Sequence, residues 1–272
     1  MRFDLLSWLN VDLTLVRSTF EEIPMAAYPA LAGYGRAGVH EGLQGQGGLF
    51  LAHDMAGMLK LEPGMRVLDL GCGVGTTALY LAKTLGVHVV GVDEEEPGSL
   101  KRRISEAGLE GLVTFVRAEA RNLPFLPGTF DAIFSMNAFF YFGTDKAYPA
   151  YLLTFLKAGG EVVIGSPCYR EELQADTPEE FLLEYPACLA VHSPGWWRSH
   201  FAQTGTVEVL RSEVHPLGAA FWSDRVRFLL ESQRPADMPP AMGAMVHAII
   251  RMLNRDEDGF VTHFTLHARK RA

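Results

Sequence analysis

A glycine-rich stretch at residues 65–77 constrains the fold of this chain more than any other feature. It reads M-R-V-L-D-L-G-C-G-V-G-T-T, and an amphipathic helical pattern follows from Thr76. The apolar residues that open the stretch are typical of a strand buried on both faces. The alternate glycines, Gly71, Gly73 and Gly75, allow positive φ angles and the close approach of a ligand. A strand, a glycine turn and a helix N-terminus together predict a nucleotide-binding corner.

The acid Asp69, two positions before the first glycine, indicates which class of nucleotide the turn can bind. A dinucleotide fingerprint has its third glycine at the position of Thr76, so the spacing differs from that of a pyrophosphate site. A carboxylate here would repel a pyrophosphate, whereas it suits a ligand that carries an ammonium or another cation. A second acid, Asp93, ends the predicted strand 87–92. It lies about 20 residues beyond the first glycine, where ribose hydroxyls are usually bound.

Four blocks in order resemble the class I S-adenosylmethionine-dependent methyltransferases. They are V-L-D-L-G-C-G-V-G-T, G-V-D, A-E-A-R-N-L-P-F at 118–125 and T-F-D-A-I-F-S at 129–135. L-K-A-G-G-E-V-V-I at 156–164 is similar to the family's approach to its fifth strand. The resemblance covers about residues 45–170. The Trp196-Trp197 pair resembles a segment that follows the fifth strand in small-molecule enzymes of the cyclopropane-synthase-like and ubiquinone-pathway type.

The resemblance implies an α/β fold, a Rossmann-like and mostly parallel seven-stranded sheet with an antiparallel last strand. Residues 1–48 are expected to form an N-terminal helical extension or a lid over the cofactor, and residues 49–272 the methyltransferase domain. Helical insertions on the substrate side are expected at about 170–204 and 218–254. The apolar patterns place the strands at 66–70, 87–92, 113–117, 130–135, 161–165, 207–215 and 259–268.

S-adenosyl-L-methionine is the cofactor that the resemblance implies. Asp93 and Glu94 would share the ribose, Glu119 and Ala120 would meet the adenine, and Asn137 would lie beside the cofactor after the fourth strand. No metal is expected, because the three cysteines lack zinc-site spacing. The residues of the turn that would contact the cofactor are Asp69, Gly71, Cys72, Gly73, Gly75 and Thr76.

Methyl transfer from a sulfonium is an in-line displacement, in which the protein chiefly aligns donor and acceptor and excludes water. Related small-molecule enzymes often have an acid or a histidine where this chain has Asn137 and Phe140. This difference favours an acceptor that is already nucleophilic, such as an amine, a thiol, a thiolate or an arsenite-like centre. Tyr141 and His192 are the candidate catalytic bases, with His200 as a further one.

Aromatic side chains are expected to line the acceptor pocket. At least one of residues 139–142 would lie there, because four aromatic residues in a row at a strand end cannot all enter one core. The Trp196-Trp197 pair has two interpretations, plain packing or a cation–π contact with a cationic acceptor.

We predict transfer of a methyl group to a small-molecule acceptor through nitrogen, sulfur, oxygen or a similar nucleophile. Two alternatives remain open: a non-catalytic sensor or scaffold that binds S-adenosylmethionine, and another sulfonium-using transferase such as a cyclopropane synthase. The net charge of −8 and the short basic clusters at 101–103 and 269–271 argue against a nucleic-acid partner. No apolar run is long enough for a membrane span, and the N-terminus lacks the layout of a signal peptide. We therefore expect a cytoplasmic protein, compatible with a homodimer and without a membrane partner.

Overall fold

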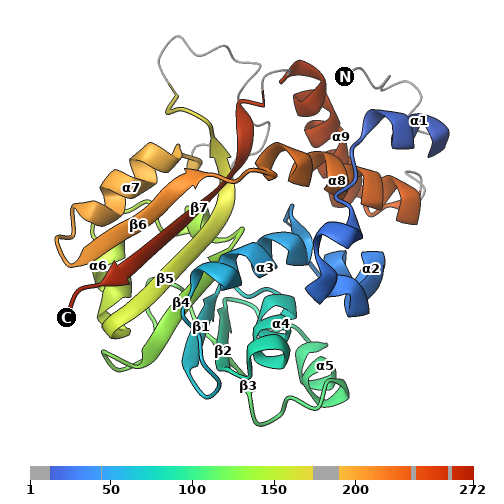
Figure 1. Ribbon diagram of the computed structural model, residues 1–272. Helices are drawn as coiled ribbons and strands as arrows, with labels where there is room; N and C mark the ends of the chain where they lie inside the picture. The colour runs from blue at the N-terminus through green and yellow to red at the C-terminus, as the bar shows by residue number, and fades with distance from the viewer. Residues whose placement is uncertain (1–12, 44, 174–189, 234–236, 257–258) are drawn as a thin grey trace.

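A seven-stranded sheet forms the centre of the molecule (Figure 1). The computed structural model describes residues 13–43, 45–173, 190–233, 237–256 and 259–272. The strand order is β3-β2-β1-β4-β5-β7-β6. β7 (Val261–Lys270) runs antiparallel to its neighbours β5 and β6 (Val207–Val214), which confirms the predicted antiparallel last strand. The five mutually parallel strands are β1 (Arg66–Leu70), β2 (His88–Asp93), β3 (Val113–Arg117), β4 (Phe130–Met136) and β5 (Leu156–Tyr169).

The strand order reverses between β1 and β4, because the chain adds β2 and β3 on one side before it returns to the other. Ligands of open α/β sheets bind outside the carboxyl ends of the strands at such a switch point. The parallel register aligns Leu70 with Val92 and Asp69 with Phe134. The ends of β1, β2 and β4 therefore meet at one edge of the sheet.

Helices cover both faces of the sheet (Figure 1). α3 (Gly48–Met58), α4 (Thr76–Leu85) and α5 (Leu100–Glu106) lie on one face. α6 (Tyr148–Thr154) and α7 (Pro194–Ala202) lie on the other. The remaining α-helices lie on the right of Figure 1. α1 (Leu13–Thr19), α8 (Gly218–Ser232) and α9 (Pro240–Arg255) are at the upper right, and α2 (Gly35–His40) lies below them. Short 3-10 helices occur at Met25–Ala27, Pro29–Tyr34 and Phe139–Tyr141.

Two apolar clusters pack on the opposite faces of the sheet, because successive side chains of a strand point to opposite sides. In β1, Leu68 belongs to the first cluster and Val67 to the second. α8 contributes to both, with Trp222 in the first cluster and Phe221 in the second. The segment predicted as a helical insertion at 218–254 is thus part of the hydrophobic core.

The predicted elements differ from the observed ones mainly at their ends. β5 extends beyond the expected 161–165 on both sides, and it accommodates Gly159 at positive φ where its register with β4 shifts. α7 begins with Pro194 in its first turn, and the Ser193 side chain accepts a hydrogen bond from the backbone N–H of Trp196. Residues 174–189 of the helical insertion expected at about 170–204, which include Cys188, one of the three cysteines, lie outside the described residues.

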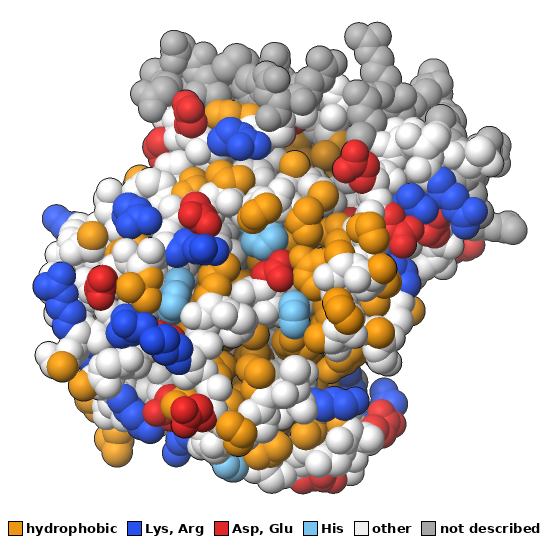
Figure 2. Space-filling view, in the orientation of Figure 1, with side chains coloured by type: hydrophobic (Ala, Val, Ile, Leu, Met, Phe, Trp, Pro, Cys, Tyr) orange, Lys and Arg blue, Asp and Glu red, His pale blue; other side chains and the backbone are white. Residues whose placement is uncertain are grey.

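Two surface properties bear on the expected partners. Within the described ranges, no helix combines the length and the hydropathy that a membrane span needs. Lys and Arg side chains are interspersed with acidic and hydrophobic ones on the face that Figure 2 shows.

Candidate functional site

The glycine turn between β1 and α4 adopts a conformation that favours glycine. Gly71, Gly73 and Gly75 have φ angles of 75°, 53° and 80°. A Cβ on Gly71 would lie 2.3 Å from the Cβ of Ala138, so this glycine lets the turn pack against the loop after β4. A Cβ on Gly73 would meet none of the described atoms within 4 Å. The turn is therefore closed at its first glycine and open at its second.

Asp93 at the end of β2 lies beside this open position. Its carboxylate accepts a hydrogen bond from the backbone N–H of Gly73 at 2.8 Å, and the residue is half-buried. Its backbone carbonyl accepts from the N–H of Ala118 after β3 at 3.0 Å. The structure thus brings together the glycine turn and the second-strand acid, which the sequence separates by 20 residues.

Asp69 is buried beneath the turn, with 1% of its surface exposed. Its carboxylate accepts a hydrogen bond from the Thr77 hydroxyl on α4. Burial raises the pKa of Asp69 to about 7, the hydrogen bond from Thr77 acts in the opposite direction, and the charge of Asp93 raises the pKa further. This acid ties the end of β1 to the start of α4, and its predicted contact with a ligand ammonium stays a prediction.

Cys72 and Thr76 fix the two ends of the turn. Cys72 is 5% exposed and packs on Gly91, where an added Cβ would lie 2.9 Å from the Cys72 sulfur. Burial raises the pKa of the Cys72 thiol well above its usual range, so it remains protonated. The Thr76 hydroxyl donates to the backbone carbonyl of Glu41 at 2.9 Å and accepts from Arg103 at 3.0 Å.

A glycine-rich segment lies across this corner of the sheet. We call residues 41–43 and 45–47 the crossing segment; residue 44 lies outside the described residues. At one end Glu41 contacts Thr76, as above, and a Cβ on Gly42 would lie 2.5 Å from the Val74 side chain. At the other end the Asn137 side-chain amide donates to the Gln46 carbonyl at 2.8 Å. The segment therefore runs from the glycine turn to the loop after β4.

Asn137 has the only positive φ of the described non-glycine residues, 54°. Its backbone N–H donates to the carbonyl of Gly165 on β5 at 2.8 Å. The side-chain oxygen is buried and has no hydrogen-bond partner within the described ranges. Asn137 thus joins β4, β5 and the crossing segment at the predicted ligand position.

The other predicted cofactor residues lie at the carboxyl ends of β2 and β3. The Glu94 side chain is exposed, and its carbonyl accepts from Arg117 at 2.8 Å. The Glu119 carboxylate accepts from the side chain of Arg121 at 3.0 Å and from its backbone N–H at 2.8 Å. Ala120 is buried, and its carbonyl accepts from the Tyr148 hydroxyl at 3.0 Å. Their contacts with ribose and adenine stay predictions.

The two candidate bases both pack on aromatic neighbours. The Tyr141 ring is 54% exposed and packs on Phe140, with 4.1 Å between ring centroids. His192 contacts the Glu172 carboxylate at 2.7 Å and stacks on Trp196 with centroids 3.8 Å apart. Within the described ranges, no turn residue is a hydrogen-bond partner of either side chain. Their catalytic roles therefore stay predictions.

His200, the further candidate base, stacks on the other face of Trp196, with ring centroids 4.4 Å apart. Its Nε2 contacts the carbonyl of Gly143 at 2.9 Å. Burial lowers the pKa of His200. The histidine is thus part of the packing between α7 and the loop after β4.

The aromatic residues expected near the acceptor divide between core and surface. Phe139, Phe140 and Phe142 are buried, and Tyr141 is exposed. Phe139 packs edge-on against Trp197, which is 1% exposed, with centroids 5.4 Å apart. Of the two interpretations of the tryptophan pair, packing describes Trp197.

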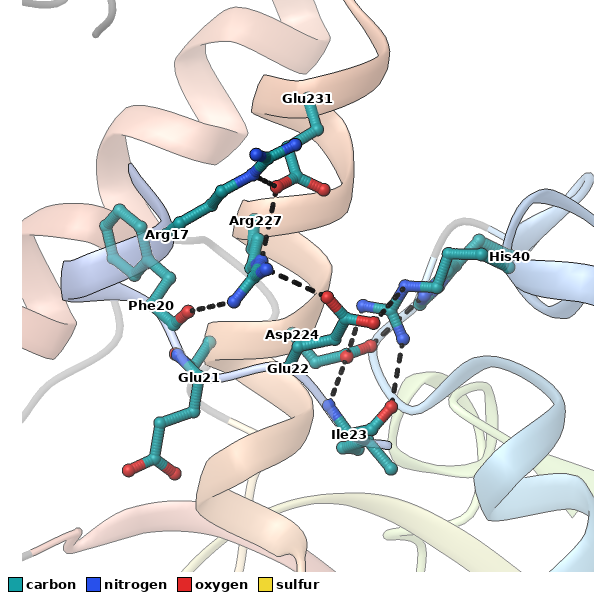
Figure 3. Close-up of polar contacts among 11 residues, drawn as sticks. Arg17, Phe20, Glu21, Glu22, Ile23, His40, Asp224, Arg227 and Glu231 are labelled. Atoms are coloured by element: carbon teal, nitrogen blue, oxygen red, sulfur yellow. Dashed lines mark hydrogen bonds and ion pairs between the residues drawn. The ribbon is translucent and has the colours of Figure 1, made fainter. Parts of the chain in front are cut away.

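Contacts between the N-terminal segment and α8 were not predicted from the sequence (Figure 3). Asp224 on α8 is fully buried and pairs with Arg36 and, at 3.1 Å, with Nε2 of His40. It also accepts from the backbone N–H of Ile23 at 2.8 Å. Charged residues at 224, 225 and 227 within an otherwise apolar helix are the signal that could have indicated buried partners.

Comparison with known proteins agrees with this geometry. Residues 67–160 match the family model of a methyltransferase domain. A glycine/sarcosine/dimethylglycine N-methyltransferase of Actinopolyspora halophila is 29% identical over 56% of this chain and 27% of its own length. Phosphoethanolamine N-methyltransferase 3 of Arabidopsis thaliana is 33% identical over 47% of this chain and 26% of its own length. The chain thus spans about a quarter of the length of these curated relatives.

Solved structures share the fold over most of the chain. A putative sarcosine dimethylglycine methyltransferase from Galdieria sulphuraria superposes with a TM-score of 0.66 at 21% identity, covering 82% of this chain and 84% of that one. Haemonchus contortus phosphoethanolamine N-methyltransferase 2 in complex with S-adenosyl-L-methionine superposes with a TM-score of 0.69 at 17% identity, covering 92% and 60%. Residues 67–160 therefore form a methyltransferase domain, and the chain has the fold of solved S-adenosylmethionine-dependent methyltransferases.

Proposed function

We propose that this protein transfers a methyl group from S-adenosylmethionine to a small-molecule acceptor. The main support is the hydrogen bond that the Asp93 carboxylate accepts from the N–H of Gly73, where the turn leaves space for a ligand. The crossing segment lies over the same corner of the sheet. The names of the relatives give glycine, sarcosine, dimethylglycine and phosphoethanolamine as acceptors, all of them small molecules.

The residues of the corner fit this cofactor. A carboxylate at the position of Asp93 can accept hydrogen bonds from both hydroxyls of a ribose. The open position at Gly73 provides space for a ligand to approach the backbone. The half-buried Glu119 and the buried Ala120 lie at the end of the neighbouring strand, where the adenine is expected. When bound, the cofactor supplies an electrophilic methyl group on a sulfonium.

The chain's own contribution is alignment of the acceptor and exclusion of water. The crossing segment supports the second role, because its bonds to Thr76 and Asn137 hold it across the corner. We infer that it acts as a lid, the alternative being a fixed extension. An amine, thiolate or other electron-rich acceptor needs no strong base to attack the methyl group. Tyr141 and His192 are proposed for proton removal only where the acceptor requires it.

Isothermal titration with S-adenosylmethionine and S-adenosylhomocysteine tests the first half of the proposal, which is that the protein binds the cofactor. Absence of binding by both would overturn it. Release of S-adenosylhomocysteine in the presence of glycine, sarcosine, dimethylglycine or phosphoethanolamine tests the second half. Cofactor binding without turnover across a wider panel of amines, thiols and alcohols would favour the sensor alternative.

A further inference from the structure

Arg225 is a buried cation that forms no ion pair within the described part of the chain. The residue is 5% exposed, and Nη2 donates to the carbonyl of Leu43 at 2.7 Å. Nε is buried without a partner within the described part of the chain. The adjacent acid, Asp224, is already engaged by Arg36 and His40. Burial lowers the pKa of Arg225 to about 10 and Asp224 raises it, so the guanidinium stays charged at neutral pH.

Among the described residues, no carboxylate forms an ion pair with this guanidinium. Burying a charge is costly unless it is paired and hydrogen-bonded. Arg carries five N–H donors in a planar fork that matches carboxylate and phosphate oxygens. Among the described residues, the hydrogen-bond acceptor of Arg225 is the Leu43 carbonyl, and Nε has none. The free donor of this fork would match an oxyanion.

Trp222 places a second donor beside this cation. It precedes Arg225 by three residues on α8, a spacing that makes two helical side chains neighbours. Trp222 is 5% exposed, and its indole N–H has no partner within the described ranges. Two unpaired donors on one helix, one charged and one neutral, thus lie one turn apart.

His263 on β7 adds a hydrogen-bond acceptor to the same place. Its ring centroid lies 5.2 Å from that of Trp222, and the residue is fully buried. Nδ1 lies 3.1 Å from the carbonyl of Gly218, so this nitrogen carries the proton. Nε2 is then a lone-pair acceptor, and it has no partner within the described ranges.

These groups lie next to the cofactor corner. Leu43, which binds Arg225, belongs to the crossing segment and follows Gly42, which packs on Val74 of the glycine turn. His263 pairs with Pro167 on β5, two residues beyond Gly165, the partner of Asn137. α8 therefore places the unpaired donors between the crossing segment and the ends of β5 and β7.

Resting on the proposed function, we propose that Arg225 and Trp222 bind an oxyanion of the methyl acceptor, a carboxylate or a phosphate. His263 Nε2 accepts a hydrogen bond from a donor on the same molecule. The substrate class is a small molecule that carries both an oxyanion and an N–H or O–H group. The methyl group is transferred to a nucleophilic atom of this molecule.

Titration of the full chain, saturated with S-adenosylhomocysteine, tests the proposal with two pairs of probes. Phosphoethanolamine is compared with ethanolamine, and sarcosine with sarcosinamide, so that each pair differs in the oxyanion. We expect the anionic member of one pair to bind about 10- to 100-fold more tightly, the range given by hydrogen bonds to charged groups. The pair that responds distinguishes phosphate from carboxylate.

Variants of α8 show which residues cause the preference for the probe that carries the oxyanion. Arg225→Met should remove most of this preference, Arg225→Lys should retain part of it, and Trp222→Phe should reduce it several-fold. Affinity for the uncharged probes, measured at saturating S-adenosylhomocysteine, should stay unchanged. Arg227→Met is the matched control, because this arginine of the same helix has acidic partners of its own in Glu22 and Glu231. It should bind the anionic probe as the wild type does.

Thermal unfolding without probes separates ligand binding from a structural role. Because Arg225 forms no ion pair with any described residue, Arg225→Met should melt at the wild-type temperature or above it, whereas a structural arginine would lower the melting temperature. Equal affinity of Arg225→Met and wild type for the anionic probe would overturn the inference, as would equal affinity of both members in both pairs. Absence of S-adenosylhomocysteine binding by the wild type would instead overturn the proposed function. If Arg225→Met fails to fold, Trp222→Phe and Arg225→Lys decide.

Discussion

The carboxylate of Asp93 and the backbone N–H of Gly73 are joined by a hydrogen bond of 2.8 Å, which fixes the end of β2 to the glycine turn. This contact places an acid beside the open position of the turn. We expect Asp93→Ala to weaken binding of S-adenosylhomocysteine about 10- to 100-fold, because hydrogen bonds to a charged group contribute about 1.5–3 kcal/mol. Isothermal titration of the folded variant measures the change.

Glu95→Ala provides the control for Asp93→Ala. It removes an equal charge from an exposed residue two positions along the chain. We expect its affinity to remain within about twofold of the wild type, because exposed charges are screened by solvent. Equal affinities of Asp93→Ala and Glu95→Ala would show that the second-strand acid does not hold the ribose.

A second prediction concerns the stability of the N-terminal segment on α8 (Figure 3). Asp224→Asn removes the charge that is buried between Arg36 and His40. Breaking a buried ion pair from one side leaves an uncompensated charge and typically costs about 3–5 kcal/mol. We expect a loss of this size in the free energy of unfolding, measured by urea denaturation.

Glu231→Gln is the matched control on the same helix. Glu231 pairs with Arg17, which is 63% exposed, and with Arg227, which keeps Glu22 as a second acidic partner. We therefore expect a smaller loss than for Asp224→Asn, because pairs with exposed side chains contribute about 0–1 kcal/mol. A loss for Asp224→Asn no larger than that for Glu231→Gln would mean that the N-terminal segment is not held by the buried carboxylate.

The central part of the fold could be predicted because its signals are local. Gly71, Gly73 and Gly75 specify the turn through their own backbone freedom, and the apolar runs specify the strands. Ser193 and Pro194 specify the start of α7 in the same way. The turn, the strands and this helix start each depend on residues close together in the sequence. One sequence is therefore enough to predict them.

The contacts of α8 could not be predicted, because their partners are distant in the sequence. Asp224 and Arg36 are separated by 188 positions, and no local pattern links them. The burial of each aromatic residue in the run after β4 could not be predicted either. Its composition indicates a strand end, but tertiary packing decides that Phe139 enters the core and that Tyr141 remains 54% exposed. The position of a single side chain therefore depends on tertiary packing, whereas the helix or strand that contains it depends on local sequence.

Asp69 gives a prediction for pH. Its pKa is raised from 3.8 to about 7 in the folded protein, chiefly by burial. Between these values the folded state binds more protons than the unfolded state, so the stabilising contribution is complete below about pH 4 and is lost as pH rises through 7. The difference between the two pKa values corresponds to roughly 4 kcal/mol.

Asp69→Asn isolates this contribution, because an amide cannot ionise. Urea unfolding at pH 5 and pH 8, without cofactor, should show that the wild type loses stability relative to the variant as pH rises. Other titrating groups cancel in the comparison. Parallel stability profiles of the two proteins would mean that Asp69 ionises normally in the fold.

The last prediction concerns the bond between Asn137 and the crossing segment. Asn137→Gly keeps the positive φ and removes the hydrogen bond to the Gln46 carbonyl, which contributes about 0.5–1.5 kcal/mol. If the crossing segment acts as a lid, dissociation of S-adenosylhomocysteine should become about 2- to 10-fold faster. Asn137→Ala should have the same effect and in addition lower the free energy of unfolding by about 1–2 kcal/mol, because alanine is strained at positive φ. Competition kinetics measure the first effect and urea denaturation the second. Wild-type dissociation rates in both variants would identify the crossing segment as a fixed extension and not a lid.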